Sequence, residues 1–595
     1  MLMIAERMKD ALINSKDKET IQELDQELAK IIEKLMRAVD VETLRLARKN
    51  GRNLVSQFYC TSFSVVYVEQ SFLLERLQPV KTSYDLDHCC MEGTRQFLLS
   101  QIVDWVQDTS GREDGVHGNT YWLYGSPGIG KTTLAHSICA SLHDRKQLGG
   151  VFFCRRDDPH LSKHRNILPT LINTLAGVFP PFRMVVADRF RNDPILTPES
   201  IKPTLFLDLI HDLPHPPHTL AFVIDAFDEC GDTNSRRVIL NVLTNMAART
   251  PWLKVIVTSR PEADIQRFFG DSLIRSSYLQ YNLAADEHAT SDLRVFACSR
   301  FERVAAKRHL RQWPEEPLLS QVISRAEGLF IFIETVALAL ERSIDPNEFL
   351  KATLQDATGT RSKSLYNLYS SILERRTVVD GNLKFQRMIG VLLTAAPHRP
   401  LCEETIAELA RVELHLVETW VDDLSSLLYR DEKANGTIRI RHLSISDFFE
   451  SEDCHCDYRV NRQDANRQLG IACLETMLAQ LRFNICKLED SRVANADVKD
   501  LASRILENIS DALQYSCLYW SDHICFIAGD GDGQVRGCLK EFFGGLYPLF
   551  WVEVLSILGM VPVGVPSLRR VRSWAKVSIA AVCYSNRLEN GANLL

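Results

Sequence analysis

The sequence predicts an α/β fold in which a doubly wound parallel sheet is followed by mainly helical regions. Between residues 96 and 270, helical segments alternate with short apolar runs that lack polar alternation, as parallel strands buried on both faces do. A glycine-rich stretch separates the first of these runs from a helical segment. After residue 270 the strand pattern fades and helical spacing predominates. With 595 residues, 45% of them hydrophobic, the chain can form about three to five domains.

The composition favours a cytoplasmic protein that binds neither nucleic acid nor membrane. A formal net charge of −7 gives no long-range attraction to nucleic acid. Charged residues within MLMIAERMKD interrupt the apolar core that a secretory signal needs. The 16 cysteines show no repeated spacing, as expected of reduced thiols. The Cys-His-Cys cluster at 454–456 has no second ligand pair at zinc-site spacing, so an ordinary loop is favoured over a zinc site.

Residues 542–566 form an apolar stretch long enough to cross a membrane. Glu553 would lie near the middle of the bilayer, where a carboxylate is costly, and three prolines interrupt the stretch. A buried helix, WVEVLSIL, between loops is therefore favoured over a membrane span.

The first 75 residues have a helical pattern, with apolar residues three and four apart between charged neighbours. These are Ile21, Leu24, Leu28, Ile31 and Leu35. A sustained coiled coil needs more than the two to three heptads available, so packing in a helical bundle is favoured, with a signalling module as the alternative.

Four apolar runs are the strand candidates of the sheet. They are TYWLYG (120–125), GVFFC (150–154), LAFVID (220–225) and LKVIVTS (253–259). Beyond them, SLYNLYSSILERR (364–376) and CEETIAELARV (402–412) have helical spacing, and GTIRIRHLSI (436–445) is a short β-like interruption.

The sequence GSPGIGKT follows the first strand candidate and fits G-x-x-x-x-G-K-[ST], the pattern of a P-loop (Walker A) that binds nucleotide phosphates. Its glycines let backbone N–H groups approach phosphate oxygens, and the following helix adds partial positive charge. Lys131 is expected to reach the β- and γ-phosphates of ATP, and Thr132 to bind Mg²⁺. The residues expected to bind ATP or ADP are Gly125, Ser126, Pro127, Gly128, Ile129, Gly130, Lys131, Thr132 and Thr133.

A second strand must bring a carboxylate to the Mg²⁺ ion and the attacking water, and LAFVID ends in Asp225. The small Ala226 leaves room near the phosphates. Asp228 and Glu229 follow on the turn, and one of them is expected to orient water. The spacing does not decide which of the two does so.

Arg260 follows the run LKVIVTS, which we expect to lie beside the phosphate-binding strand. An arginine there can sense the γ-phosphate because its planar guanidinium pairs with phosphate oxygens. The alternative is a surface arginine in a turn before Pro261.

Together these motifs resemble the NACHT-type P-loop module of fungal NLR-like proteins of the STAND class, also called nephrocystin-3-like. The resemblance rests on GSPGIGKTTLA, VIDAFDEC and VIVTSRPE, and on a C-x-x-G-T-R motif at residues 90–95. It implies a Walker A lysine and hydroxyl, an extended acidic Walker B motif and a sensor arginine, at Lys131, Thr132, Asp225, Asp228, Glu229 and Arg260. It also implies that His442, in RHLSISDFF, contacts the β-phosphate of ADP in the resting form. Taken alone, His442 is more simply a structural histidine.

The resemblance covers roughly residues 85–575 and implies an order of domains. These are a helical N-terminal region (1–84), a NACHT P-loop NTPase domain (85–275), a helical subdomain (276–380), a winged-helix-like domain (381–465) and a helical C-terminal region without sensor repeats (466–595). Two departures stand out: GLFIFIETV lacks the proline that touches adenine in many STAND proteins, and no repeat sensor follows the winged helix.

The resulting hypothesis is an ATP/ADP-dependent signalling switch, with weak ATPase activity and self-assembly in the ATP state. Its N-terminal region would contact a protein partner. An ordinary P-loop ATPase, or a scaffold that does not depend on nucleotide, are the alternatives.

Overall fold

The computed structural model describes residues 69–108, 118–193, 209–210, 213–271, 278–311, 313–355, 361–376, 382–489, 493, 495–527 and 533–575. The helical pattern predicted for the first 75 residues, with its stripe from Ile21 to Leu35, lies almost entirely outside them. The described residues divide into two compact units, one made of 69–78 with 183–193 and one made of the rest.

In the smaller unit, polar contacts join the two chain segments. The Arg183 side chain donates to Gln70 (3.2 Å), and Arg76 donates to the Phe190 carbonyl oxygen (3.0 Å). Arg183 and Phe190 lie on α7 (Pro180–Asn192).

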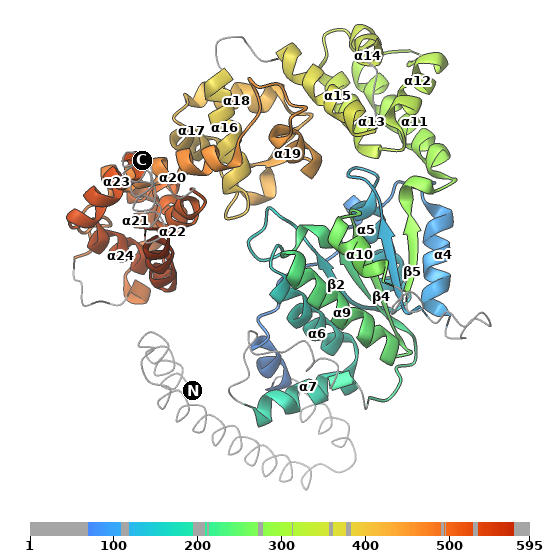
Figure 1. The fold of residues 1–595 in the computed structure, drawn as a ribbon, viewed down its shortest axis with the longest axis horizontal. Helices are drawn as coiled ribbons and strands as arrows, with labels where there is room; N and C mark the ends of the chain where they lie inside the picture. Colours follow the sequence, from blue (N-terminus) through green and yellow to red (C-terminus); the bar gives the residue numbers. More distant parts are fainter. Residues whose placement is uncertain are drawn as a thin grey trace, which may run out of the picture. The chain divides into compact units, whose positions relative to one another are not determined.

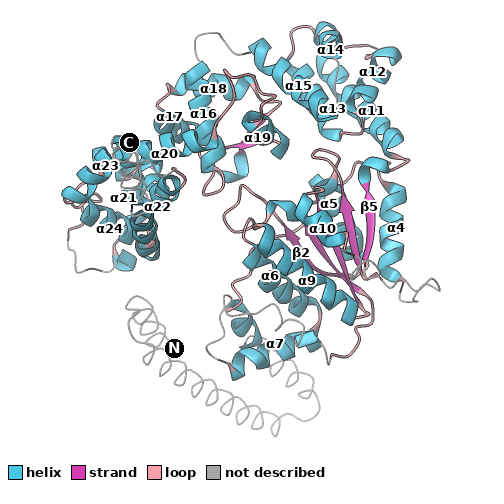
Figure 2. Cartoon of the chain, viewed as in Figure 1, coloured by secondary structure: helices cyan, strands magenta, loops and turns pink. Residues whose placement is uncertain are grey.

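The larger unit contains a five-stranded parallel sheet (Figures 1 and 2), in the order β2-β3-β4-β1-β5. Its strands are β1 (Thr120–Tyr124), β2 (Leu148–Phe153), β3 (Leu220–Asp225), β4 (Leu253–Ser259) and β5 (Tyr278–Asn282). The four strand candidates are confirmed. The strand pattern fades after residue 270, yet one more strand of the sheet, β5, follows. This edge strand buries only one residue fully, so its sequence lacks the apolar run that marks the others.

Helices cover both faces of the sheet, which explains the continuous burial of its central strands. Tyr121 and Leu123 of β1 belong to one core with the helices α4 (Gln96–Gln107) and α5 (Lys131–Asp144). The intervening Trp122 points to the opposite face and stacks on Phe269 of α10 at 4.6 Å. That face also carries α6 (Ile167–Val178), α9 (Thr233–Arg249) and α10 (Ala263–Phe269), so the predicted doubly wound sheet is present.

The strand order brings three strand ends together. β4 lies between β1 and β3, and all three run in the same direction, so their carboxyl ends meet at one edge of the sheet. The amide of Gly125, after β1, donates to the Ser259 carbonyl oxygen at 3.4 Å. The amide of Ala226, after β3, donates to the Thr258 hydroxyl at 3.0 Å.

After the sheet the described chain is mainly helical, as predicted. The first group is α11 (Ala289–Arg308), α12 (Glu316–Ala326), α13 (Phe330–Arg342), α14 (Pro346–Gln355) and α15 (Arg361–Arg376). The second is α16 (Asn382–Ala395), α17 (Glu403–Ala410), α18 (Leu414–Asp423), the antiparallel pair β6 (Leu428–Asp431) and β7 (Thr437–Ile440), and α19 (Leu443–Glu450). The third is α20 (Arg462–Gln480), α21 (Leu501–Asn508), α22 (Asp511–Cys525), α23 (Gly533–Gly544) and α24 (Tyr547–Ile557). The domain boundaries given above remain predictions.

The apolar stretch near the C-terminus forms a packed helix, α24, whose Trp551, Val554 and Leu555 are buried. None of the helices within the described ranges is long and apolar enough to cross a membrane. Glu553 has a local reason to be there: its carboxylate accepts the backbone N–H groups of Asn484 and Ile485, both at 3.2 Å. The carboxylate thus satisfies two donors of a turn that packs against α24.

Replacing Glu553 with alanine should leave these two N–H groups without acceptors. We expect the turn around residues 484–488 to open more easily, by about 1–3 kcal/mol, and its amides to exchange hydrogen faster. Glu541→Ala, at an exposed position of α23, is the matched control and should leave exchange at Asn484 and Ile485 unchanged. Equal exchange in both variants would show that the contact does not hold the turn.

Candidate functional site

The predicted phosphate-binding residues, Gly125–Thr133, form the loop between β1 and α5 and the first turn of that helix. Gly128 (φ +80°) and Gly130 (φ +95°) adopt left-handed conformations, which glycine tolerates best. The Lys131 ammonium donates to the carbonyl oxygens of Gly125 (2.8 Å) and Ser126 (3.0 Å). Burial lowers its pKa to about 8. The lysine is thus already folded over the loop that would surround a phosphate.

Asp225 lies at the end of β3 and is 1% exposed. Its Oδ1 accepts a 2.5 Å hydrogen bond from the Thr258 hydroxyl. Burial raises the pKa of Asp225, while hydrogen bonds from the side chains of Thr258 and Thr132 oppose the rise. The predicted metal ligands Thr132 and Asp225 are therefore adjacent, and a hydroxyl with a carboxylate suits Mg²⁺, which prefers oxygen ligands.

Asp228 and Glu229 occupy the short 3-10 turn Phe227–Glu229, which follows Ala226 in a left-handed conformation (φ +50°). Asp228 Oδ1 accepts the Arg260 amide N–H at 2.9 Å, and Oδ2 lies 3.3 Å from Arg260 Nε. Glu229 Oε2 accepts the Arg156 amide N–H at 3.2 Å. Burial, followed by the charge of Asp228, raises the pKa of Glu229 to about 7. The two acids therefore differ: Asp228 is paired with a cation, whereas Glu229 titrates near neutrality.

Arg260 follows β4, beside the phosphate-binding strand, and its side chain is only 15% exposed. Besides Asp228, its guanidinium contacts Asp447 of α19, with Nη1 at 2.6 Å from Oδ2. Burial opposes the charge of Arg260, but Asp447 and then Asp228 outweigh it and raise its pKa. The placement does not match the surface arginine considered as the alternative.

His442 caps the N-terminus of α19, where its Nδ1 accepts the Ser444 amide N–H at 3.1 Å. Burial, then the charges of Lys131 and Arg260, lowers its pKa to about 3, so the ring is neutral. Because Nδ1 accepts, Nε2 carries the proton in this hydrogen-bond assignment. The ring also lies over the P-loop: its Cε1 would be 3.8 Å from a Cβ on Gly128. His442 is thus both a structural cap and a neighbour of the loop.

The start of α13 packs directly on the P-loop. The Ile331 amide donates to the Gly128 carbonyl oxygen at 3.2 Å. A Cβ on Gly128 would lie 2.1 Å from Ile331 Cγ2, closer than atoms can approach. The segment GLFIFIETV, in which the family proline is missing, therefore reaches the phosphate loop through backbone and isoleucine.

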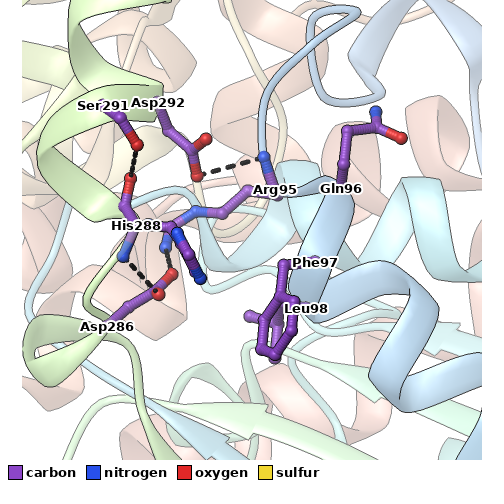
Figure 3. A pocket seen from close by; sticks show the side chains of 8 residues that line it. All are labelled: Arg95, Gln96, Phe97, Leu98, Asp286, His288, Ser291 and Asp292. Carbon is purple, nitrogen blue, oxygen red and sulfur yellow. Dashed lines mark hydrogen bonds and ion pairs between the residues drawn. The ribbon is translucent and has the colours of Figure 1, made fainter.

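Arg95, from the C-x-x-G-T-R motif, stabilises the P-loop through its side chain. It is buried and left-handed (φ +56°). Its guanidinium pairs with Asp286, donates to the Ile129 carbonyl oxygen (3.1 Å) and lies 5.3 Å from the centre of the Phe330 ring. A pocket of about 190 Å³ lies at this place, and Figure 3 shows the side chains that line it. It is lined by Arg95, Gln96, Phe97, Leu98, Asp286, His288, Ser291 and Asp292.

The Cys-His-Cys cluster at 454–456 does not have the arrangement of a structural zinc site. His455, Cys456 and Asp457 are exposed, and their candidate ligand atoms lie within 4.8 Å of one another. Cys454 is buried and stands outside that group. Three neighbouring residues on an exposed turn do not form the closed ligand set of a structural zinc site.

Three further residues of the site were not predicted as site residues from the sequence: Arg95, Arg156 and Asp447. Arg95 belongs to the C-x-x-G-T-R motif, and its hydrogen bond to the Ile129 carbonyl oxygen places it at the loop. The charged residues that follow the strand candidate GVFFC, and those within RHLSISDFF, are the signals that could have pointed to Arg156 and Asp447. No spacing rule pairs them with the P-loop, however.

The sheet order, the glycine loop entering α5 and the acids at the end of β3 define the P-loop NTPase fold class. Residues 93–260 match the family model described as the N-terminal part of nephrocystin 3. Over 528 residues, the chain is 23% identical to the vegetative incompatibility protein HET-E-1 of Podospora anserina. The alignment covers 81% of this chain and 37% of that relative, so the chain spans less than half the length of the curated protein it matches.

The family match and the fungal relative together support a NACHT/STAND-like protein with a P-loop module of the nephrocystin-3 type. Two solved structures are similar to it at 13% identity. A Walker-type ATPase of Pyrococcus abyssi has a TM-score of 0.30 and covers 62% of this chain and 99% of its own. The ORC2 protein of Aeropyrum pernix in its ADP form has a TM-score of 0.28 and covers 62% of this chain and 93% of its own.

Gly128→Ala should disrupt the packing of α13 on the P-loop, because the new Cβ would overlap Ile331. We expect a loss of about 1–3 kcal/mol in stability, measured as a lower melting temperature. Gly328→Ala is a matched control, since Gly328 has a similar φ of +86° with open space around it. A second change, Ile331→Ala, should restore part of the loss. Equal losses in the two alanine variants would mean that backbone strain, and not the contact, is responsible.

The raised pKa of Glu229 predicts a pH-dependent stability. Below about pH 7 the folded chain holds a proton on Glu229, whereas the unfolded chain releases it near pH 4.5. The free energy of unfolding should therefore fall as pH rises between these values, and Glu229→Gln should remove this part of the slope.

We compare the melting temperatures of Glu229→Gln and wild type from pH 5 to pH 8. They should diverge, with the variant the more stable at pH 8, and the difference in the free energy of unfolding should be at most about 3 kcal/mol. Glu262→Gln, at an exposed position near the same edge, is the control. Parallel curves for Glu229→Gln and wild type would refute the expected proton uptake.

Proposed function

We propose that this protein is a nucleotide-dependent switch of the NLR type, in which ADP holds a closed form and ATP permits self-assembly. The observation that supports it most is the convergence of separate parts of the chain on one loop. The P-loop is contacted by α13 through Ile331, and the ring of His442, the cap of α19, lies beside Gly128. A nucleotide on this loop would touch the helical parts as well as the sheet, so its identity can bias their arrangement.

Within this proposal each site residue has a role. Lys131 and the loop amides bind the phosphates, and Thr132 with Asp225 holds Mg²⁺, which would neutralise phosphate charge. Asp228 keeps Arg260 in place. Glu229, whose pKa is raised to about 7, is the acid better suited to take a proton from water. His442 offers Nε2–H to the β-phosphate of ADP.

The energetic scale fits a switch. Moving a two-state equilibrium from 1:99 to 99:1 needs about 5.5 kcal/mol of differential binding. Charge-assisted hydrogen bonds contribute roughly 1.5–3 kcal/mol each, so a few contacts that distinguish ATP from ADP suffice. P-loop hydrolysis without a supplied arginine finger can be as slow as about 10⁻⁴ per second, which lets each state persist. We therefore expect weak ATPase activity.

Assembly into a homo-oligomer in the ATP state, a protein partner for the N-terminal region and a cytoplasmic location belong to the same proposal. An ordinary ATPase would instead show fast steady turnover, and a scaffold would behave identically with and without nucleotide.

The direct test has two parts. The first identifies the nucleotide that copurifies with the full chain, and the second measures the mass of the protein in ADP and in a non-hydrolysable ATP analogue. Wild type should retain ADP and shift to a larger species with the analogue. Lys131→Ala should lose bound nucleotide and show no shift, because the loop loses its positive charge. Lys540→Ala, on the exposed face of α23, should behave as wild type. Fast turnover without bound ADP, or identical behaviour of Lys131→Ala and wild type, would overturn the proposal.

A further inference from the structure

Arg260 is held from two sides by carboxylates of different origin. Asp228 belongs to the same edge of the sheet and contacts both the backbone and Nε of Arg260. Asp447 belongs to α19 and contacts the other end of the guanidinium, Nη1, at 2.6 Å. A guanidinium is planar with fixed N–H directions, so the two carboxylates occupy separate donors. Asp228 can therefore stay in place while the partner of Nη1 changes.

Asp447 also faces a second cation of the sheet edge. Its Oδ1 lies 3.8 Å from Nη1 of Arg156, the residue whose amide binds Glu229. One carboxylate of α19 thus stands between two arginines that follow β2 and β4. An anionic group placed between two arginines beside a P-loop has the surroundings that a terminal phosphate would require.

A second ion pair joins the same parts of the chain and provides a comparison. Arg439 of β7 lies 3.9 Å from Asp157, which follows β2, and both side chains are partly exposed. This pair touches neither Arg260 nor the P-loop residues. It contributes to the same contact between parts, but it has no means of responding to phosphate.

We propose that Asp447 is a positioning residue: its carboxylate binds Nη1 of Arg260 as a substitute for the terminal phosphate of a nucleoside triphosphate. We call this Arg260–Asp447 contact the latch. A γ-phosphate and Asp447 then compete for Nη1 of Arg260. The diphosphate lacks that group, so it leaves the Arg260–Asp447 pair and the position of α19 undisturbed. This inference rests on the proposed nucleotide switch and assigns the contact through which the third phosphate acts.

Competition has a reciprocal consequence: if ATP weakens the Asp447 contact, removal of that contact strengthens ATP binding by the same factor. ADP binding should change little. The signature of the latch is therefore a change in the ratio of the two affinities, which a general loosening of the protein would not produce.

The test uses the full chain with Mg²⁺, and measures the dissociation constants of ADP and of a non-hydrolysable ATP analogue. Asp447→Asn should raise analogue affinity about five- to tenfold, change ADP affinity less than twofold, and move assembly to a lower analogue concentration. Asp157→Asn, which removes the neighbouring Arg439 pair together with the half-exposed Arg155–Asp157 pair, should leave the ratio unchanged. In an Arg260→Ala background, Asp447→Asn should have no effect on the ratio, because the residue through which it acts is gone.

An unchanged ratio in Asp447→Asn would overturn the latch, as would an equal change in Asp157→Asn. If Asp447→Asn does not fold, hydrogen exchange of wild type tests the same inference. Hydrogen exchange of the α19 amides should be faster with the analogue than with ADP, and equal exchange would overturn the inference. Failure of the proposed function is seen separately, since wild type would then turn ATP over rapidly without retaining ADP, or would behave as Lys131→Ala does.

Discussion

The site depends on the parallel register of β1, β3 and β4. Val255 of β4 is level with Thr120 of β1 on one side and with Phe222 of β3 on the other. This shared level brings the loop after β1, the carboxylate at the end of β3 and the arginine after β4 to a single edge. Burial on both faces is what keeps the three strands in register, because a slip by one residue would reverse the face of every side chain.

Placing these groups together concentrates buried charge, and the protein offsets it internally. Lys131 donates to carbonyl oxygens of its own loop, and Arg260 divides its donors between Asp228 and Asp447. Glu229 accepts the Arg156 amide N–H, and burial raises its pKa to about 7. Buried charges are tolerated only when paired and hydrogen-bonded. Most charged groups of the site therefore already have partners, and binding a nucleotide would exchange partners rather than supply the first ones.

The sequence predicted the sheet best where burial is most complete. The runs that became β1 to β4 are apolar because both faces are covered, whereas β5 was missed since most of its residues are only half-buried. Asp225, the last residue of β3, and Arg260, which follows β4, could be located because strand ends share an edge. Asp447 could not, because it lies 187 residues from Arg260 and only the packing of α19 brings the two together. The N-terminal prediction lies almost wholly outside the described residues.

The properties of His442 narrow the way in which α19 can respond to nucleotide. Its pKa of about 3 keeps the ring neutral throughout the physiological range, so α19 is not set by protonation of this histidine. A neutral Nε2–H can bind a β-phosphate, but ADP and ATP both carry one. Discrimination between them must come from a group that meets the third phosphate. Arg260 is the cation of this edge whose side chain also reaches α19 at hydrogen-bond distance. His442 would contact the β-phosphate of either nucleotide, whereas Arg260 would contact ATP alone. The first contact would then depend on whether a nucleotide is bound, and the second on which nucleotide it is.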